Sequence, residues 1–152
     1  MNAFTRPRRF RMAITGIVLA AFLFRSQVAQ ALVVRGDDFM YRGESATALA
    51  HYSRALRLDP NSSIAADRYV FVQMERHTGT ALRSCISTAN AYLLKNPNDA
   101  TVLGDRAMCY LLQRRYARAL RDFRAAVRLS PGTRQYVIAT HVLRRLAKGS
   151  ND

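Results

Sequence analysis

The sequence predicts an all-α protein made of repeated helical hairpins. When residues 46–60 (ATALAHYSRALRLDP) are aligned without gaps on 117–131 (ARALRDFRAAVRLSP), seven of the fifteen positions are identical. Ala, Leu and Arg recur at helical spacing, whereas Val, Ile and aromatic residues never alternate with polar residues over the length of a strand. With only 7 Gly and 4 Pro in 152 residues, the chain does not have the composition of a disordered protein.

Residues 1–28 differ from the rest and predict a signal peptide or a membrane anchor. Four arginines between positions 6 and 11 precede the uninterrupted apolar run 12–24, and residues 29–31 (AQA) provide a small-residue cleavage site. The run is shorter than the stretch of about 20 residues that a spanning helix needs, although Arg11 and Arg25 would suit the two interfaces of a short anchor. A buried amphipathic helix is the third alternative. Under the first two, the remainder of the chain lies across the membrane.

The residues matched when this alignment is extended outward fall where two antiparallel helices would touch. Small residues recur at positions that let the helices approach closely, an aromatic residue fills the space beside them, and a proline follows each second helix. Gly43 would break the chain between the helices of the first hairpin. The matched pairs are Gly36 with Ala107, Phe39 with Tyr110, Ala48 with Ala119, Tyr52 with Phe123, Ala55 with Ala126 and Pro60 with Pro131.

This pattern resembles the tetratricopeptide repeat, a helix–turn–helix unit of about 34 residues. Pro97 precedes Pro131 by one such repeat length and marks a third copy between the other two. The resemblance implies a right-handed superhelical array over residues 29–149, preceded by an N-terminal apolar helix. A helical bundle with coincidental periodicity is the alternative. The expected units are hairpins at about 29–62, 63–99 and 100–133, and a capping helix at about 134–148 that covers the last apolar face.

The middle hairpin departs from the repeat pattern. Cys85, Ala89 and Tyr92 stand where Ala, an aromatic residue and Ala are expected. The stretch from Pro60 to Pro97 is also three residues longer than the stretch from Pro97 to Pro131. We place the three extra residues in the turn around 75–80.

Members of this family bind peptides or helices in a concave groove lined by the first helix of each hairpin, and the resemblance implies such a groove here. It would be mainly apolar, with Met and Phe side chains that suit an adaptable binding surface. The Lys, Arg and Asn residues with which some members grip a C-terminal carboxylate are absent from these positions. Packing on the capping helix, the N-terminal helix or one another is the alternative. The expected groove residues are Val33, Asp37, Met40, Asp67, Phe71, Met74, Gly104, Met108 and Leu111.

Positive charge is concentrated in the C-terminal third. The formal net charge is +14; residues 100–151 hold eleven basic and two acidic residues, whereas residues 32–99 hold eight and seven. Such a surface suits acidic protein or anionic lipid, and nucleic acid least, because no aromatic residues interleave with the arginines. A solvated outer face is the alternative. The expected basic face comprises Arg114, Arg115, Arg118, Arg121, Arg124, Arg128, Arg144 and Arg145.

The two cysteines predict a testable contact. Cys85 and Cys109 lie at equal distances along the chain on either side of Pro97, where two antiparallel neighbouring helices are expected to turn. Both thiols should therefore lie at one height along the pair. In an oxidising compartment they would form a disulfide if both point into the seam between the two helices and their Cα atoms come within about 7 Å. Two buried small apolar residues are the alternative.

The sequence does not indicate catalysis, a cofactor or a metal site. His51, His77 and His141 fall in different expected elements, without Cys, Asp or Glu at metal-ligand spacing. There is no Gly-rich phosphate loop and no nucleophile elbow. We therefore expect an exported or membrane-tethered interaction module, placed on the periplasmic side of a bacterial inner membrane, that binds a peptide, helix or acidic surface of another protein. The alternative is a permanent structural subunit held in a membrane complex by its N-terminal helix.

Overall fold

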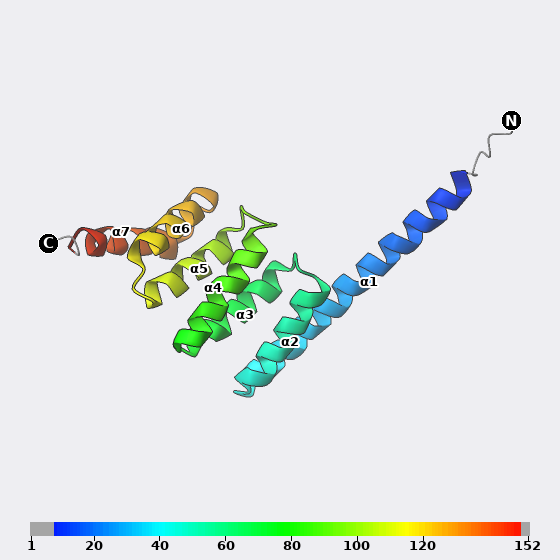
Figure 1. The fold of residues 1–152 in the computed structure, drawn as a ribbon, viewed down its shortest axis with the longest axis horizontal. Coiled ribbons are helices and arrows are strands. Elements are labelled where there is room, and N and C mark those ends of the chain that lie inside the picture. Colours follow the sequence, from blue (N-terminus) through cyan, green and yellow to red (C-terminus); the bar gives the residue numbers. More distant parts are fainter. Residues whose placement is uncertain (1–7, 150–152) are drawn as a thin grey trace.

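The computed structural model describes residues 8–149, with side chains for residues 19–145, and all regular structure in this part is α-helical (Figure 1). Short connections join the helices, which run antiparallel in consecutive pairs. The seven helices of this part are α1 (Arg8–Tyr41), α2 (Ser45–Leu58), α3 (Ser63–Glu75), α4 (Gly79–Leu93), α5 (Ala100–Leu112), α6 (Tyr116–Leu129) and α7 (Arg134–Gly149).

Three helix pairs stack in sequence order. The pairs are α1 with α2, α3 with α4, and α5 with α6; α2 also packs on α3, and α4 on α5. The helix α7 packs on α6 and closes the array, while the N-terminal part of α1 extends away from the other helices at the opposite end (Figure 1). The prediction of an all-α array of helical hairpins is therefore confirmed.

Small residues lie where the helices of each pair touch. Ala48 in α2 and Ala119 in α6 are completely buried. At Gly36 in α1, the ring of Tyr52 in α2 occupies the place that a Cβ atom would take; such an atom would lie 2.8 Å from Cδ1 of the ring. Tyr52 is itself completely buried, so the ring fills the space that the glycine leaves open.

The prediction that the extra residues of the middle hairpin lie in the turn at 75–80 is wrong. That turn covers only residues 76–78 and is as long as the other two hairpin turns. Thr78 fixes the start of α4, because its hydroxyl accepts a hydrogen bond from the Ala81 amide at 3.1 Å. The extra length lies further on: α4 has 15 residues, against 14 in α2 and α6, and the connection 94–99 is longer than the equivalent connections. The register of α3 is therefore unaffected.

The helix α1 runs unbroken through the expected boundary near residue 28. Ala29 is only 1% exposed and packs in the core of the first hairpin. The alternative of a buried amphipathic helix does not hold for the stretch just before it, because its large apolar side chains are more than half exposed. These are Leu19, Phe22, Leu23 and Phe24.

The expected leader is covered only in part, since residues 1–7 lie outside the described range. For the helices between residues 8 and 149, we find none that is both long enough and apolar enough to cross a bilayer.

Candidate partner-binding surfaces

The nine expected groove residues come from α1, α3 and α5, which are neighbouring helices in the array. We call the surface formed by these three helices the groove face. Phe71 is the open apolar side chain of the set, with 45% of its surface exposed. The three methionines and Leu111 are half-buried and pack against the hydrophobic cores of the array. These four residues therefore pack inside the array, as in the alternative to a partner-binding groove.

Two of the expected groove positions are buried. Gly104 in α5 lies beneath Tyr136 of α7, and a Cβ atom at Gly104 would lie 2.8 Å from Cζ of that ring. Gly104 is therefore not open to a partner, because the capping helix covers it. Val33 in α1 is 5% exposed and packs into the core of the first hairpin.

A line of polar contacts joins α1, α2 and α3 on the groove face. The hydroxyl of Tyr52 donates to Oδ1 of Asp37 at 2.7 Å, and Nε of Arg68 lies 3.1 Å from the same oxygen. Nη1 of Arg68 lies 3.3 Å from Oδ2 of Asp67. Burial, followed by the hydrogen bond to Asp37, raises the pKa of Tyr52. The tyrosine therefore keeps its proton and remains a donor to Asp37.

Asp105 in α5 extends this line towards α7. Burial, followed by the charge of Asp67, raises the pKa of Asp105 from its ordinary value of 3.8 to about 8. Oδ2 of Asp105 is buried without a hydrogen-bond partner among the described residues. Burial and the charge of Asp105 also raise the pKa of Tyr136. The carboxyl of Asp105 thus holds its proton to higher pH than an exposed aspartate does.

Asp105→Asn is expected to stabilise the protein at neutral pH by about 1–3 kcal/mol. The folded protein keeps the Asp105 proton up to about pH 8, whereas the unfolded chain loses it near pH 4. The unfolding free energy of the wild type therefore falls as pH rises between these values, and asparagine removes this loss. Denaturant unfolding at pH 4 and pH 7.5 measures the difference, with Asp38→Asn, at an exposed carboxylate, as control. An equal gain at both pH values would contradict the assignment.

The open space on the groove face lies between α1 and the start of α3. A hollow of about 580 Å³ is found there, with Asp37 and Asp59 among its polar lining groups. Its apolar lining includes Val34 and Ile64, which are 68% and 56% exposed. Val33 also lines this hollow, and Val33 and Asp37 belong to the groove residues expected from the sequence. Val34, Asp59 and Ile64 occupy positions that the repeat pattern does not assign to a groove.

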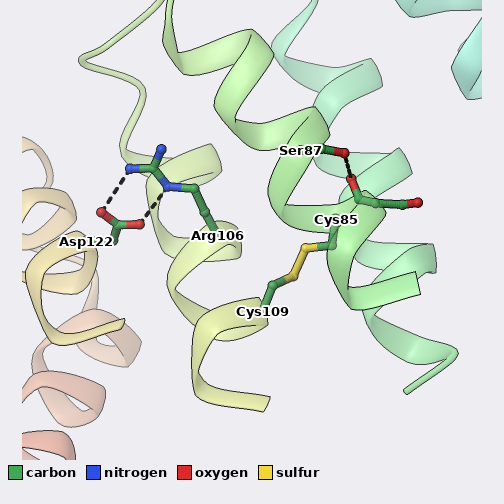
Figure 2. The surroundings of a disulfide bond; sticks show 6 residues. Cys85, Ser87, Arg106, Cys109 and Asp122 are labelled. Atoms are coloured by element: carbon green, nitrogen blue, oxygen red, sulfur yellow. Dashed lines mark hydrogen bonds and ion pairs between the residues drawn. A yellow bond between two sulfur atoms is a disulfide. The ribbon is translucent and has the colours of Figure 1, made fainter. Parts of the chain in front are cut away.

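The eight arginines of the basic face are all exposed on or beside α6 and α7. None of them forms an ion pair with a described carboxylate. Arg118 lies over the ring of Tyr110 at 5.7 Å from its centroid. In contrast, Asp122 of the same region is 5% exposed and accepts two hydrogen bonds from Arg106, at 2.7 and 2.9 Å (Figure 2).

Cys85 in α4 and Cys109 in α5 face each other in the seam between the two helices and form a disulfide (Figure 2). Their Cα atoms are 6.5 Å apart, and both residues are completely buried. The separation lies within the range that disulfide geometry allows. The bond connects the second hairpin to the third.

The histidines are not brought together. His51 stacks on Phe39 with ring centroids 5.1 Å apart, His77 lies in the turn after α3, and His141 is on α7. Among the residues described, no group of three or more His, Cys, Asp and Glu side chains is arranged to hold a metal ion.

Stacked helical hairpins with small residues at their contacts define the chain as a helical-repeat protein. The sequence profile described as Tetratricopeptide repeat matches residues 23–139, and the chain belongs to the tetratricopeptide-repeat family. No curated protein matches the chain.

Solved structures of the same fold share little sequence with this chain. The first repeat domain of human RPAP3 has a TM-score of 0.74 and 15% identity, covering 84% of this chain and 98% of that one. The Arabidopsis OM64 repeat domain has a TM-score of 0.71 and 16% identity, covering 80% and 98%. The first repeat domain of Spaghetti (RPAP3), bound to the HSP90 peptide SRMEEVD, has a TM-score of 0.71 and 17% identity, covering 84% and 96%. At these identities the similarity shows the shared fold.

Proposed function

We propose that the protein is a non-enzymatic interaction module that holds a segment of another protein on its groove face. The exposed ring of Phe71 and the hollow bordered by Val34 and Ile64 carry this proposal. Exposed apolar side chains around a hollow are the features that a peptide- or helix-binding groove needs. The module would act as a scaffold, assembly factor or accessory subunit of a membrane or envelope complex.

The charges on the groove face support an apolar or cationic partner segment. Asp37 and Asp67 outnumber the one arginine that contacts them, Arg68, and Asp59 adds a further carboxyl group to the hollow. An acidic peptide such as the SRMEEVD bound by the Spaghetti domain would meet like charges here.

We place the repeat domain outside the cytoplasm, exported across or anchored in a membrane. The disulfide between Cys85 and Cys109 supports this placement, because disulfides persist in oxidising compartments such as the periplasm. The basic residues followed by the apolar run 12–24 support it independently.

The second candidate function, a permanent subunit held by an intact N-terminal helix, is favoured by the contacts of α1. Cleavage after Ala31 would remove Ala29, which is buried in the first hairpin, and Ser26, whose hydroxyl donates to Asp59 at 3.3 Å. N-terminal sequencing of protein from soluble and membrane fractions separates the candidates. A mature chain beginning at Leu32 supports a free adaptor, and an intact chain in the membrane fraction supports the anchored subunit.

Phe71→Glu is expected to reduce capture of the partner at least tenfold, because it places a charge in the apolar contact. Tagged full-length protein would be recovered from solubilised membranes after crosslinking, and the captured chains identified and quantified. Leu94→Glu is the matched control, since Leu94 is 85% exposed at the end of α4, away from the groove face. Equal capture by both variants would refute binding at the groove face.

A further inference from the structure

The basic face lacks compensating charge. Asp105 and Asp122 are the only acids among residues 100–149; Asp122 is 5% exposed, and Oδ2 of Asp105 is buried. Asp122 lines a hollow with Arg118 and Arg121, but both of its oxygens already accept hydrogen bonds from Arg106. It therefore offers the arginines on adjacent turns of α6 little relief from their mutual repulsion. An Arg-rich composition alone does not explain this, because residues 32–99 carry seven acids beside eight bases. The face fits an anionic surface outside the chain.

The helix α7 presents apolar side chains among these cations. Ile138 and Val142 lie one turn apart and are 53% and 51% exposed. Arg134 and Arg145, which are also exposed, lie on the same stripe, one turn before Ile138 and one turn after Val142. This mixture is typical of a helix lying in a membrane interface, where apolar side chains enter the headgroup boundary and cations meet phosphates.

A hollow of about 340 Å³ lies between α6 and α7. Its lining includes Arg124, Arg128, Arg144 and His141, and it contains no acidic residue. Val127 and Val137 also line this hollow. Guanidinium groups bind phosphate oxygens in a bidentate manner, so three arginine residues beside one small hollow suit a phosphate group. A hollow of this size has room for a phosphate and its ester substituents rather than for a folded partner.

We propose that the basic face, together with Ile138 and Val142, is a docking surface for an anionic phospholipid bilayer. The hollow receives a lipid phosphate, the surrounding arginines lie against neighbouring headgroups, and the two apolar side chains enter the interface. This surface is separate from the groove face, because it belongs to α6 and α7 rather than to α1, α3 and α5. It lies at the end of the array opposite the projecting part of α1 (Figure 1).

Co-sedimentation of the full-length protein with vesicles tests the proposal. Vesicles of phosphatidylcholine alone are compared with vesicles in which about a third of the lipid is phosphatidylglycerol. The arginines of the N-terminal segment also favour anionic vesicles, so the readout is the change in the ratio of the two affinities between variants that share this segment. We expect wild type to prefer the anionic vesicles at least about tenfold, and the preference to fall as salt rises.

The triple variant Arg124→Gln, Arg128→Gln, Arg144→Gln is expected to lose at least about tenfold of this preference. The matched control replaces three exposed arginines elsewhere, Arg35, Arg54 and Arg83, by glutamine and should retain it. Thermal unfolding checks that both variants fold.

A second variant, Ile138→Ser with Val142→Ser, should weaken binding to the anionic vesicles while leaving the salt dependence in place. Equal affinity of wild type for the two vesicle types would overturn the proposal. So would equal preference in the two triple variants. Binding of polyglutamate to the basic face without binding to anionic vesicles would overturn it in favour of an acidic protein partner.

Discussion

Arg106→Leu is expected to lower the free energy of unfolding by about 3–5 kcal/mol. The guanidinium donates to both oxygens of Asp122, at 2.7 and 2.9 Å, and to Oδ1 of Asn90 at 2.8 Å. Because Asp122 is 5% exposed, leucine leaves a carboxylate that has neither a partner nor full access to water. Arg106 and Asp122 connect α5 to α6, so the substitution should loosen the last hairpin.

Denaturant unfolding measures this loss against a matched exposed pair. Arg42 and Asp38 also form an ion pair, but their side chains are 57% and 51% exposed, so Arg42→Leu should cost less than about 0.5 kcal/mol. Adding Asp122→Leu to Arg106→Leu should restore part of the stability, because the buried charge is then gone. If Arg106→Leu and Arg42→Leu lose the same amount, the buried pair does not have the role assigned to it.

Gly36→Ala is expected to destabilise the protein by about 2–3 kcal/mol. In an exposed helix the same substitution stabilises by about 1 kcal/mol, so the sign of the effect is diagnostic. The new methyl group would overlap the ring of Tyr52. The ring cannot move away easily, because Tyr52 is completely buried and its hydroxyl is bound to Asp37.

Gly79→Ala provides the comparison for this substitution. Gly79 begins α4, and the nearest atom to an added Cβ would be Nη1 of Arg83 at 3.8 Å. We expect this variant to be as stable as wild type or slightly more stable, as thermal and denaturant unfolding would show. Tyr52→Leu in the Gly36→Ala background should recover stability relative to the sum of the two single changes. If the losses of stability from Gly36→Ala and Tyr52→Leu simply add in the double variant, the ring of Tyr52 is not the cause of the destabilisation by Gly36→Ala.

The features that the sequence predicted correctly depend on short-range spacing. Ala48 and Ala119 recur at the contact positions of their hairpins, and the structure buries both. The equal distances of the cysteines from Pro97 predicted that both thiols lie at one height, with a disulfide and two buried small residues as open alternatives, and in the structure both are buried in one seam and bonded. In both cases the relevant geometry is set by one helix pair, for which residue counting along the chain is enough.

The features that could not be predicted from the sequence depend on contacts between three or more helices. Asp105 feels the charge of Asp67 on α3 and itself raises the pKa of Tyr136 on α7. Gly104 is covered by Tyr136, a contact that repeat spacing does not determine. An acid next to a glycine within an apolar helix is the signal that was available. The spacing of the prolines does not locate the three extra residues of the middle hairpin, because a longer α4 and a longer connection 94–99 add the same number of residues as a longer turn.

The disulfide between α4 and α5 has a mechanical consequence. A repeat array is held together by contacts between neighbours, so it ordinarily frays from its ends and peels unit by unit. The Cys85–Cys109 disulfide joins α4 to α5 and so prevents the second and third hairpins from separating. Fraying is thus confined to the two outer ends, and tension applied along the chain would be borne in the middle of the array by a bond rather than by packing.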